Sequence, residues 1–213
     1  MRQFFRENGL SIIVFGLSFL FLLGQSLTGC WAYNEDLVGH GKAALSYGRF
    51  LWSGVFIETV FENWESEFLQ MGLYVVLTSF LFQKGSAESK PIGESVAVDR
   101  VPKRFRTRKR RLRNWLYKHS LSLALLALFA FSFVLHAVGG ARRDREEHWM
   151  AGKVSFMTAL EYVRTSRFWF ESFQNWQSEF LSIGALVVLS IFLREKGSPT
   201  SKPLGTANDQ EAA

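Results

Sequence analysis

The sequence contains one stretch of 33 residues twice, and this repeat limits the possible folds more than any other feature. Residues 61–93 and 173–205 align without a gap at an offset of 112, and 20 of the 33 aligned positions are identical. The motif reads FENWESEFLQ in the first copy and FQNWQSEFLS in the second. Weaker identities at an offset of 111, such as Gly29 with Gly140, extend the repeat toward the N-terminus of each copy.

A repeat at a fixed period indicates that one structural unit occurs twice. We therefore predict a first two-span unit in residues 1–93 and a second in residues 112–205. A polybasic linker, residues 94–111, joins them, and residues 206–213 form a polar tail.

Each copy begins with an apolar run that is long enough to cross a membrane. Residues 10–29 and 120–141 contain no Asp, Glu, Lys or Arg. At about 1.5 Å per residue, 20 helical residues cross a hydrocarbon core of about 30 Å. A second span is predicted over residues 64–83, where Asn63 is the N-cap, Trp64 lies at the headgroup level and Lys84-Gly85 marks the C-terminus.

The second copy repeats these signals with Asn175, Trp176, Lys196 and Gly197. The sequence thus predicts an all-α integral membrane protein with four transmembrane helices, built as two tandem helical hairpins with outer interfacial segments. Because each copy has an even number of spans, the hairpins share one orientation and are related by a pseudo-two-fold axis along the membrane normal.

An aromatic segment of about 35 residues separates the spans of each copy. Ser46 and Ser155 are predicted N-caps of a short helix in this segment, and the helix is expected to end near residues 53–54 and 165–166. Two interpretations stay open. The helix lies in the plane of the membrane interface, or it is an ordinary amphipathic helix folded over the spans.

Basic residues concentrate between the two copies. Residues 84–118 contain twelve Lys/Arg and three acidic residues, a local charge of +9 in a chain of net charge +6. The positive-inside rule places this linker, and with it both termini, in the cytoplasm. The run predicts contact with anionic lipid headgroups; nucleic-acid binding would also need such a patch, but no recognition module accompanies it. The predicted lipid-contacting residues are Lys103, Arg104, Arg106, Arg108, Lys109, Arg110, Arg111 and Arg113.

The motif places aromatic residues and a glycine on one helical stripe in each copy. Spacings of three and four residues bring such positions onto one face. A glycine within the stripe allows close approach of another helix in lipid, so we predict packing of the two copies or of two protomers. A cofactor-binding face is the weaker alternative, because no paired histidines are available. The stripe residues are Phe61, Trp64, Phe68 and Gly72, and Phe173, Trp176, Phe180 and Gly184.

Glu67 and Glu179 are the acidic pair that the motif keeps in both copies, whereas Glu65 becomes Gln177. We interpret Glu65 as dispensable to the repeat. For Glu67 and Glu179 two readings stay open: a carboxylate in the first turn of a helix, favoured by the helix dipole, or a pair that binds a cation or passes a proton. The candidate polar site consists of Asn63, Ser66, Glu67, Asn175, Ser178, Glu179 and His136. His136 lies inside the third span, where it is a helix contact or a proton relay.

The single cysteine, Cys30, excludes an intrachain disulfide. Residues 27–30, LTGC, resemble a lipobox, which would lead to cleavage and lipidation at Cys30. The matching span of the second copy ends in Gly139-Gly140-Ala141 without a cysteine, which favours an uncleaved helix. No catalytic constellation, metal-ligand spacing or cofactor motif is found in the sequence.

The segments FFRENGLSIIVFGL, GQSLTG and FENWESEFLQMGLYVVLTSFLFQKGSAESK resemble a family of bacterial inner-membrane proteins known only as a domain of unknown function. The resemblance covers essentially the whole chain. It implies four spans, a multi-pass protein in the bacterial inner membrane and no assigned activity. In some relatives Trp stands at the position of Cys30, which weakens the lipobox interpretation.

Three classes of function follow. The first hypothesis is a non-enzymatic interaction or scaffold protein of the membrane, as a homo-oligomer or an accessory subunit of a larger complex. The second is a small ion or proton channel or transporter that uses the Glu67/Glu179 pair. The third, an enzyme acting on lipid, would need a deep polar pocket at the outer leaflet.

Overall fold

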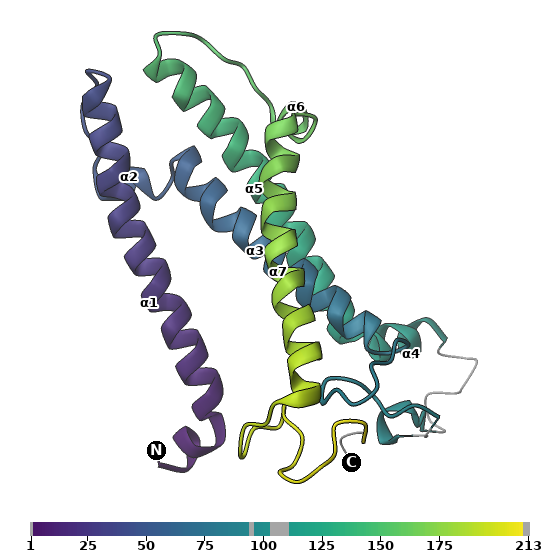
Figure 1. The fold of residues 1–213 in the computed structure, drawn as a ribbon. Helices are drawn as coiled ribbons and strands as arrows, with labels where there is room; N and C mark the ends of the chain where they lie inside the picture. Colours follow the sequence, from purple (N-terminus) through teal and green to yellow (C-terminus); the bar gives the residue numbers. More distant parts are fainter. Residues whose placement is uncertain (1, 94–95, 103–110, 211–213) are drawn as a thin grey trace. The chain divides into compact units, whose positions relative to one another are not determined.

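The computed structural model describes residues 2–93, 96–102 and 111–210, and every regular element among them is helical (Figure 1). The elements in chain order are α1 (Arg2–Gly39), α2 (Tyr47–Phe50), α3 (Gly54–Leu77), the 3₁₀ turn η1 (Ala97–Asp99), α4 (Arg111–Lys118), α5 (Ser120–Met150), α6 (Ala159–Val163) and α7 (Ser166–Phe192). Among the described residues no strand occurs, so the predicted all-α class is confirmed.

In the described part of the chain, three helices are long and apolar enough to cross a membrane: α1 over Gln3–Gly39, α5 and α7. These helices make a membrane protein plausible. Helix α3 is not among them, because it carries four glutamates and ends at Leu77. The helix that contains most of the predicted span over residues 64–83 begins ten residues earlier, at Gly54, and ends six residues earlier, at Leu77.

The early end of α3 has a local cause. Thr78 and Ser79 turn their hydroxyls back onto the carbonyls of Tyr74 and Val76, at 2.9 and 2.6 Å. Such bonds compete with the helical ladder, and the next residues form a turn. In the second copy Ile191 stands where Ser79 stands, and α7 continues to Phe192.

The starts of α3 and α7 also differ from the prediction. The helices begin at Gly54 and Ser166, so Asn63 and Asn175 lie inside them and are not N-caps. Ser53 and Thr165 occupy the capping positions instead: their hydroxyls accept from the N–H groups of Phe56 at 3.2 Å and Phe168 at 3.3 Å. This is the geometry expected of a hydroxyl cap, in which the side chain satisfies a free donor of the first turn.

The aromatic segments contain only one short helix each. Ser46 precedes α2, as predicted, but its side chain makes no capping bond. The second cap is Thr158 rather than Ser155, because Thr158 and Glu161 form a reciprocal capping box, whereas the Ser155 hydroxyl donates to Asp144. The Thr158 hydroxyl and N–H hold the pKa of Glu161 below its ordinary value.

The polar residues that were expected to open these segments are helical. Helix α1 runs on to Gly39 and α5 to Met150, each about three turns past the end of its apolar run. Cys30 is buried in the continuous helix α1, a placement that does not suit a cleavage site.

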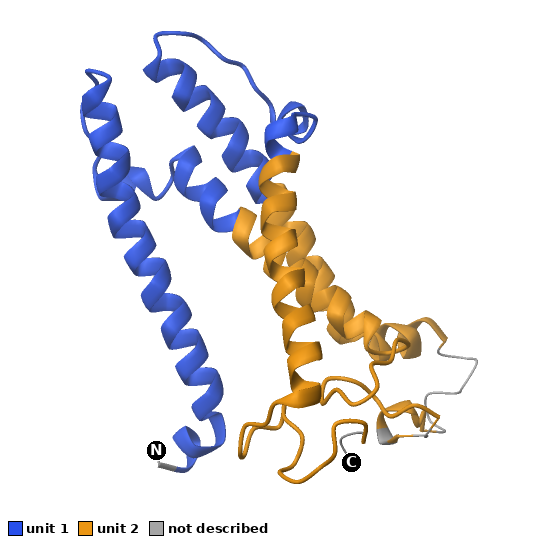
Figure 2. Cartoon of the chain, viewed as in Figure 1, with its two compact units in different colours: residues 1–61, 135–168 blue, residues 62–134, 169–213 orange. Residues whose placement is uncertain are grey.

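The described residues form two compact units (Figure 2). Unit 1 contains Met1–Phe61 and Leu135–Phe168, and unit 2 contains Glu62–Val134 and Trp169–Ala213. The boundary falls within α3, α5 and α7, so each of these helices contributes residues to both units. The core of unit 1 consists of Cys30, Tyr33, Leu37, Phe50 and Met150.

Two glycines in unit 1 admit aromatic rings at aligned positions of the two copies. A Cβ on Gly29 would lie 3.1 Å from the Phe50 ring, and a Cβ on Gly140 would lie 2.0 Å from the Tyr162 ring. Gly29 aligns with Gly140 at an offset of 111, and Phe50 aligns with Tyr162 at 112. Each copy thus places the aromatic ring of its short helix against a glycine of its first long helix.

In unit 2, a lysine side chain binds the C-terminal residues up to residue 210. Lys202 is buried, and its ammonium donates to the carbonyls of Ala207, Asn208 and Gln210 at 3.2, 3.0 and 2.9 Å. Burial lowers the pKa of Lys202. The polar tail is therefore folded back onto this side chain over its described part.

We expect Gly139→Ala to destabilise the protein by about 1–3 kcal/mol, the usual cost of overpacking. A Cβ at this position would lie 2.4 Å from the backbone nitrogen of Glu58 and 2.7 Å from its Cα, and neither atom can move independently of α3. Thermal unfolding in detergent measures the effect.

Gly24→Ala is the matched control, because its added methyl meets nothing within 4 Å. Alanine has the higher helix propensity, so this variant should be neutral or more stable by up to about 1 kcal/mol. Equal melting temperatures for the two variants would contradict the close contact at Gly139.

Candidate functional site

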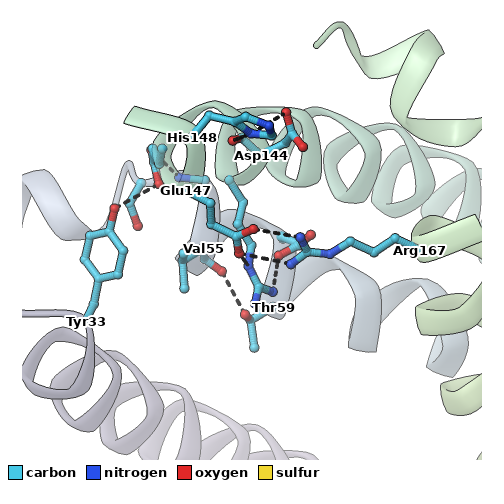
Figure 3. A network of polar contacts seen from close by, with 12 residues as sticks. Tyr33, Val55, Thr59, Asp144, Glu147, His148 and Arg167 are labelled. Carbon is cyan, nitrogen blue, oxygen red and sulfur yellow. Dashed lines mark hydrogen bonds and ion pairs between the residues drawn. The ribbon is translucent and has the colours of Figure 1, made fainter. Parts of the chain in front are cut away.

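A network of charged side chains in unit 1 is the most developed polar feature of the described residues (Figure 3). Its starting point is a close crossing of α3 and α5. A Cβ on Gly54 would lie 2.1 Å from the backbone nitrogen of Arg143, and Gly139 makes the equivalent approach to Glu58 one turn away. The order of these contacts shows that the two helices run antiparallel here, with their backbones in contact.

The crossing buries a carboxylate. Glu58 is fully buried, and its two oxygens accept hydrogen bonds from the Arg143 guanidinium at 2.6 Å and the Tyr162 hydroxyl at 2.7 Å. A buried charge is tolerated when it is paired and hydrogen-bonded, and both conditions hold. Three segments, α3, α5 and α6, are thereby tied to one carboxylate.

The network continues from Arg143 toward the start of α7. Arg143 Nε donates to Glu147 at 2.8 Å, and Glu147 accepts two bonds from Arg167, at 2.8 and 3.1 Å (Figure 3). The two-nitrogen contact between Arg167 and Glu147 is the strong, directional form of an ion pair. Acid and base alternate along this chain of contacts.

A second carboxylate on α5 joins α1 to the start of α3. Glu146 accepts the N–H of Gly54 at 2.8 Å and the hydroxyl of Tyr33 at 3.2 Å. An acidic group at a helix N-terminus is favoured by the helix dipole. Glu146 thus performs, for α3, the role that was one interpretation of Glu67.

The sequence pattern does not directly indicate that Glu58, Arg143, Glu147, Arg167 and Tyr162 form one group. Two signals were available. Gly139-Gly140 inside an apolar helix indicates close approach of other groups, and Glu58 is an acid within the otherwise apolar or neutral residues 54–61. What the sequence could not supply was the partner, since 85 residues separate Glu58 from Arg143.

His136 also belongs to unit 1. It is fully buried, stacks on Phe168 with ring centroids 4.5 Å apart and meets Tyr162 edge-on at 6.5 Å. The remaining members of the predicted polar site lie in unit 2, so the structure does not gather the seven residues in one unit.

In unit 2, α3 and α7 meet through aligned residues of the two copies. The Gln70 amide donates to the Glu179 carbonyl at 2.9 Å and to the Ser182 hydroxyl at 3.3 Å, and Gln70 aligns with Ser182. Glu67 and Glu179 lie close enough for their charges to repel one another. Both residues lie in mid-helix rather than in a first turn.

The other predicted polar residues make local contacts. Ser66 and Ser178 donate to the carbonyls of Asn63 and Asn175 on their own helices, at 2.7 and 2.9 Å. Glu65, which was interpreted as dispensable, is fully buried and accepts a bond from Ser172 at 3.3 Å. Its replacement by Gln177 in the second copy hides this role from a comparison of the copies.

The packing stripe has different surroundings in the two copies. In unit 2, Gly72 packs against Leu125 and Leu126, 3.4–3.6 Å from an added Cβ, whereas Gly184 has nothing within 4 Å. Trp64 and Phe180 are exposed by 39% and 37% and Phe173 by 57%, whereas Phe61, Phe68 and Trp176 are half-buried. Phe173 and Trp176 contact each other edge-on at 5.5 Å.

Two predicted lipid-contacting residues, Arg111 and Arg113, lie exposed on α4. The other six lie outside the described residues.

The family described as "Domain of unknown function (DUF6766)" matches residues 1–213. The chain belongs to this family. The resemblance to an uncharacterised domain family is thus confirmed, whereas the motif as its marker, the bacterial origin and the four spans stay predictions. No curated protein and no solved structure matches this DUF6766 chain.

We expect Arg143→Met to destabilise the protein by about 3 kcal/mol, because it leaves the Glu58 carboxylate buried without its cation. This is the low end of the range for a buried pair, since the Arg143 side chain keeps 31% exposure. The double variant Glu58→Gln/Arg143→Met removes the buried charge as well and should recover most of the loss.

Arg164→Met is the control, an exposed arginine in the same unit that should change stability by less than about 0.5 kcal/mol. Denaturation of all four proteins in the same detergent gives the comparison. A double variant no more stable than Arg143→Met would show that the pair does not act as one unit.

Proposed function

We propose that this protein is a four-span, non-enzymatic interaction protein of the bacterial inner membrane that associates with a second copy of itself. Its spans form two tandem hairpins, with α3 as the second span and both termini in the cytoplasm. The repeat supports this arrangement, as do the aligned contacts of Gly29 with Phe50, Gly140 with Tyr162 and Gln70 with Ser182.

The open space at Gly184 carries the proposal of self-association. Its aligned glycine, Gly72, receives Leu125 and Leu126 of α5. The residues aligned with this leucine pair are Val14 and Phe15 of α1, which are 54% and 74% exposed.

Within unit 2, nothing lies within 4 Å of a Cβ added at Gly184, and within unit 1 the aligned apolar residues Val14 and Phe15 are exposed. We assign α1 of a second copy as the occupant of the Gly184 face. Close glycine-mediated packing of this kind is a common means of helix association in lipid.

The lining of a cavity in unit 1 is also consistent with an interaction role. Its lining includes Arg49, Arg142 and Glu146 but no histidine or cysteine, and its serine, Ser53, is occupied as the cap of α3. The lining hydroxyl of Tyr33 is also engaged, since it donates to Glu146.

Cysteine cross-linking between separate chains tests the association. With Cys30 replaced by alanine, one chain carries Phe15→Cys and the other Gly184→Cys, and the two are co-expressed and oxidised in membranes. A disulfide needs Cα atoms within about 7 Å, so a covalent dimer is expected only if α1 of one copy reaches Gly184 of the other.

Leu17→Cys is the matched control, because two residues place it about 200° around α1 from Phe15 at a similar depth. It should give little cross-linking with Gly184→Cys. Equal yields for positions 15 and 17 would contradict the proposed face, as would a bond that forms only within one chain carrying both cysteines.

The second candidate function is a small ion or proton channel or transporter. The repulsion between the charges of Glu67 and Glu179, which both copies of the motif keep, favours it, since paired acids within membrane helices are commonly ion or proton sites. Proton flux in proteoliposomes should then be lost in Glu67→Gln/Glu179→Gln and kept in Glu7→Gln/Glu195→Gln, which removes two exposed acids elsewhere. Unchanged flux in the first variant would exclude this function.

A further inference from the structure

Unit 1 contains a cavity of about 350 Å³ between α1, the segment around α2, and α5. Its polar lining includes Tyr33, Arg49, Arg142 and Glu146, and its aromatic lining includes Trp52 and Trp149. A second hollow of about 330 Å³ is also lined by Arg142, Glu146 and Trp149, together with Arg145. The same three residues thus face both spaces.

The lining of this cavity has a net positive charge, from two arginines and one glutamate. Glu146, its one acidic group, already accepts bonds from the Tyr33 hydroxyl and the Gly54 N–H. Within the described part of the chain, the guanidiniums of Arg49 and Arg142 make no hydrogen bond or ion pair. Two guanidiniums therefore face the space with one carboxylate that is otherwise engaged.

Arg142 differs in this respect from its neighbours on α5. Arg143 bonds to Glu58 and Glu147, and Arg145 bonds to the carbonyl of Met157. Arg142 is half-buried and lines both hollows. A half-buried guanidinium without a protein acceptor is a ready donor for an external anion, and its planar fork matches the oxygens of a phosphate.

The surroundings add a membrane-interface character. Arg142 is the first charged residue after the apolar run of residues 120–141. Trp52 and Trp149 are exposed by 73% and 54%, and Lys42 lies over the Trp149 ring at 4.5 Å. Tryptophan and basic side chains at the end of an apolar helix are characteristic of the headgroup level.

We propose that this cavity binds a phosphate-bearing anion through Arg49 and Arg142, and that the anion is the headgroup of an anionic phospholipid at the outer membrane surface. The choice of a lipid as the source of the phosphate rests on the proposed membrane location. The expectation that Arg49 and Arg142 bind a phosphate group does not rest on it. The site is distinct from the basic linker, residues 94–111, which is predicted to face the cytoplasm.

Lipid-dependent thermal stability of the full chain in mild detergent tests the proposal. A ligand that binds the folded state raises the melting temperature in a concentration-dependent way. Phosphatidylglycerol should stabilise the wild-type protein and phosphatidylcholine should not. Arg49→Gln/Arg142→Gln should lower the apparent affinity for phosphatidylglycerol by at least about tenfold, because two charge-assisted contacts are lost.

The matched control is Arg111→Gln/Arg113→Gln, which removes the same charge from exposed positions on α4 and should keep the phosphatidylglycerol effect. Melting without lipid shows whether each variant is folded, and the single variant Arg49→Gln, at an exposed position, serves if the double variant is not. Equal phosphatidylglycerol affinity in wild type and Arg49→Gln/Arg142→Gln would overturn the site.

Inorganic phosphate separates the two sources of the ligand. If phosphate alone stabilises the wild type as well as phosphatidylglycerol does, and Arg49→Gln/Arg142→Gln abolishes both effects, the site stands but its ligand is a soluble phosphate. The two proposals can also fail separately. If Arg49→Gln/Arg142→Gln loses phosphatidylglycerol binding but the cross-link to Gly184→Cys does not form, the lipid site stands and only the proposed self-association is contradicted.

Discussion

The close crossing of α3 and α5 in unit 1 is the contact on which the rest of this unit depends. Gly54 and Gly139 let the two backbones touch, and the side chains next to the contact are then within reach of one another. Glu58 meets Arg143, and Glu146 meets the first N–H of α3. A side chain at either glycine would clash with the facing backbone and strain the contact that holds Glu58 beside Arg143. In this unit the packing of α3 against α5 and the pairing of the Glu58 charge therefore depend on the same contact.

The two copies of the repeat share their framework and differ in their charges. In both, a glycine of the first long helix receives an aromatic ring of the short helix, and a hydroxyl residue caps the next helix. The ring is Phe50 in the first copy and Tyr162 in the second, and only the tyrosine carries the hydroxyl that bonds to Glu58. Glu58 itself aligns with Phe170. The buried polar network of unit 1 therefore arises from residues that differ between the two copies, not from residues that the repeat shares.

The sequence predicted the elements that follow from local pattern. The apolar runs, for example, lie within α1 and α5. Asn63 was wrong as an N-cap because Ser53, ten residues earlier, caps a longer helix. The role of Glu65 was missed because a comparison of the copies identifies only residues that both copies share. Glu65 instead accepts a bond from Ser172, which lies in the other copy. A contact between residues as distant in sequence as Glu58 and Arg143 produces no periodic pattern, so the unit 1 network could not be predicted from the sequence.

The central claim is that α3 crosses the membrane although its composition is less apolar than that of α1, α5 and α7. Cysteine accessibility in intact cells decides it, with single cysteines introduced at the exposed positions Ala44, Val98, Val154 and Leu204 of a Cys30→Ala chain. Four spans predict that positions 44 and 154 react with a membrane-impermeant thiol reagent and that 98 and 204 react only after permeabilisation. If α3 does not cross, 44 and 98 will react alike and 154 will lie on the opposite side, which would contradict the tandem hairpins.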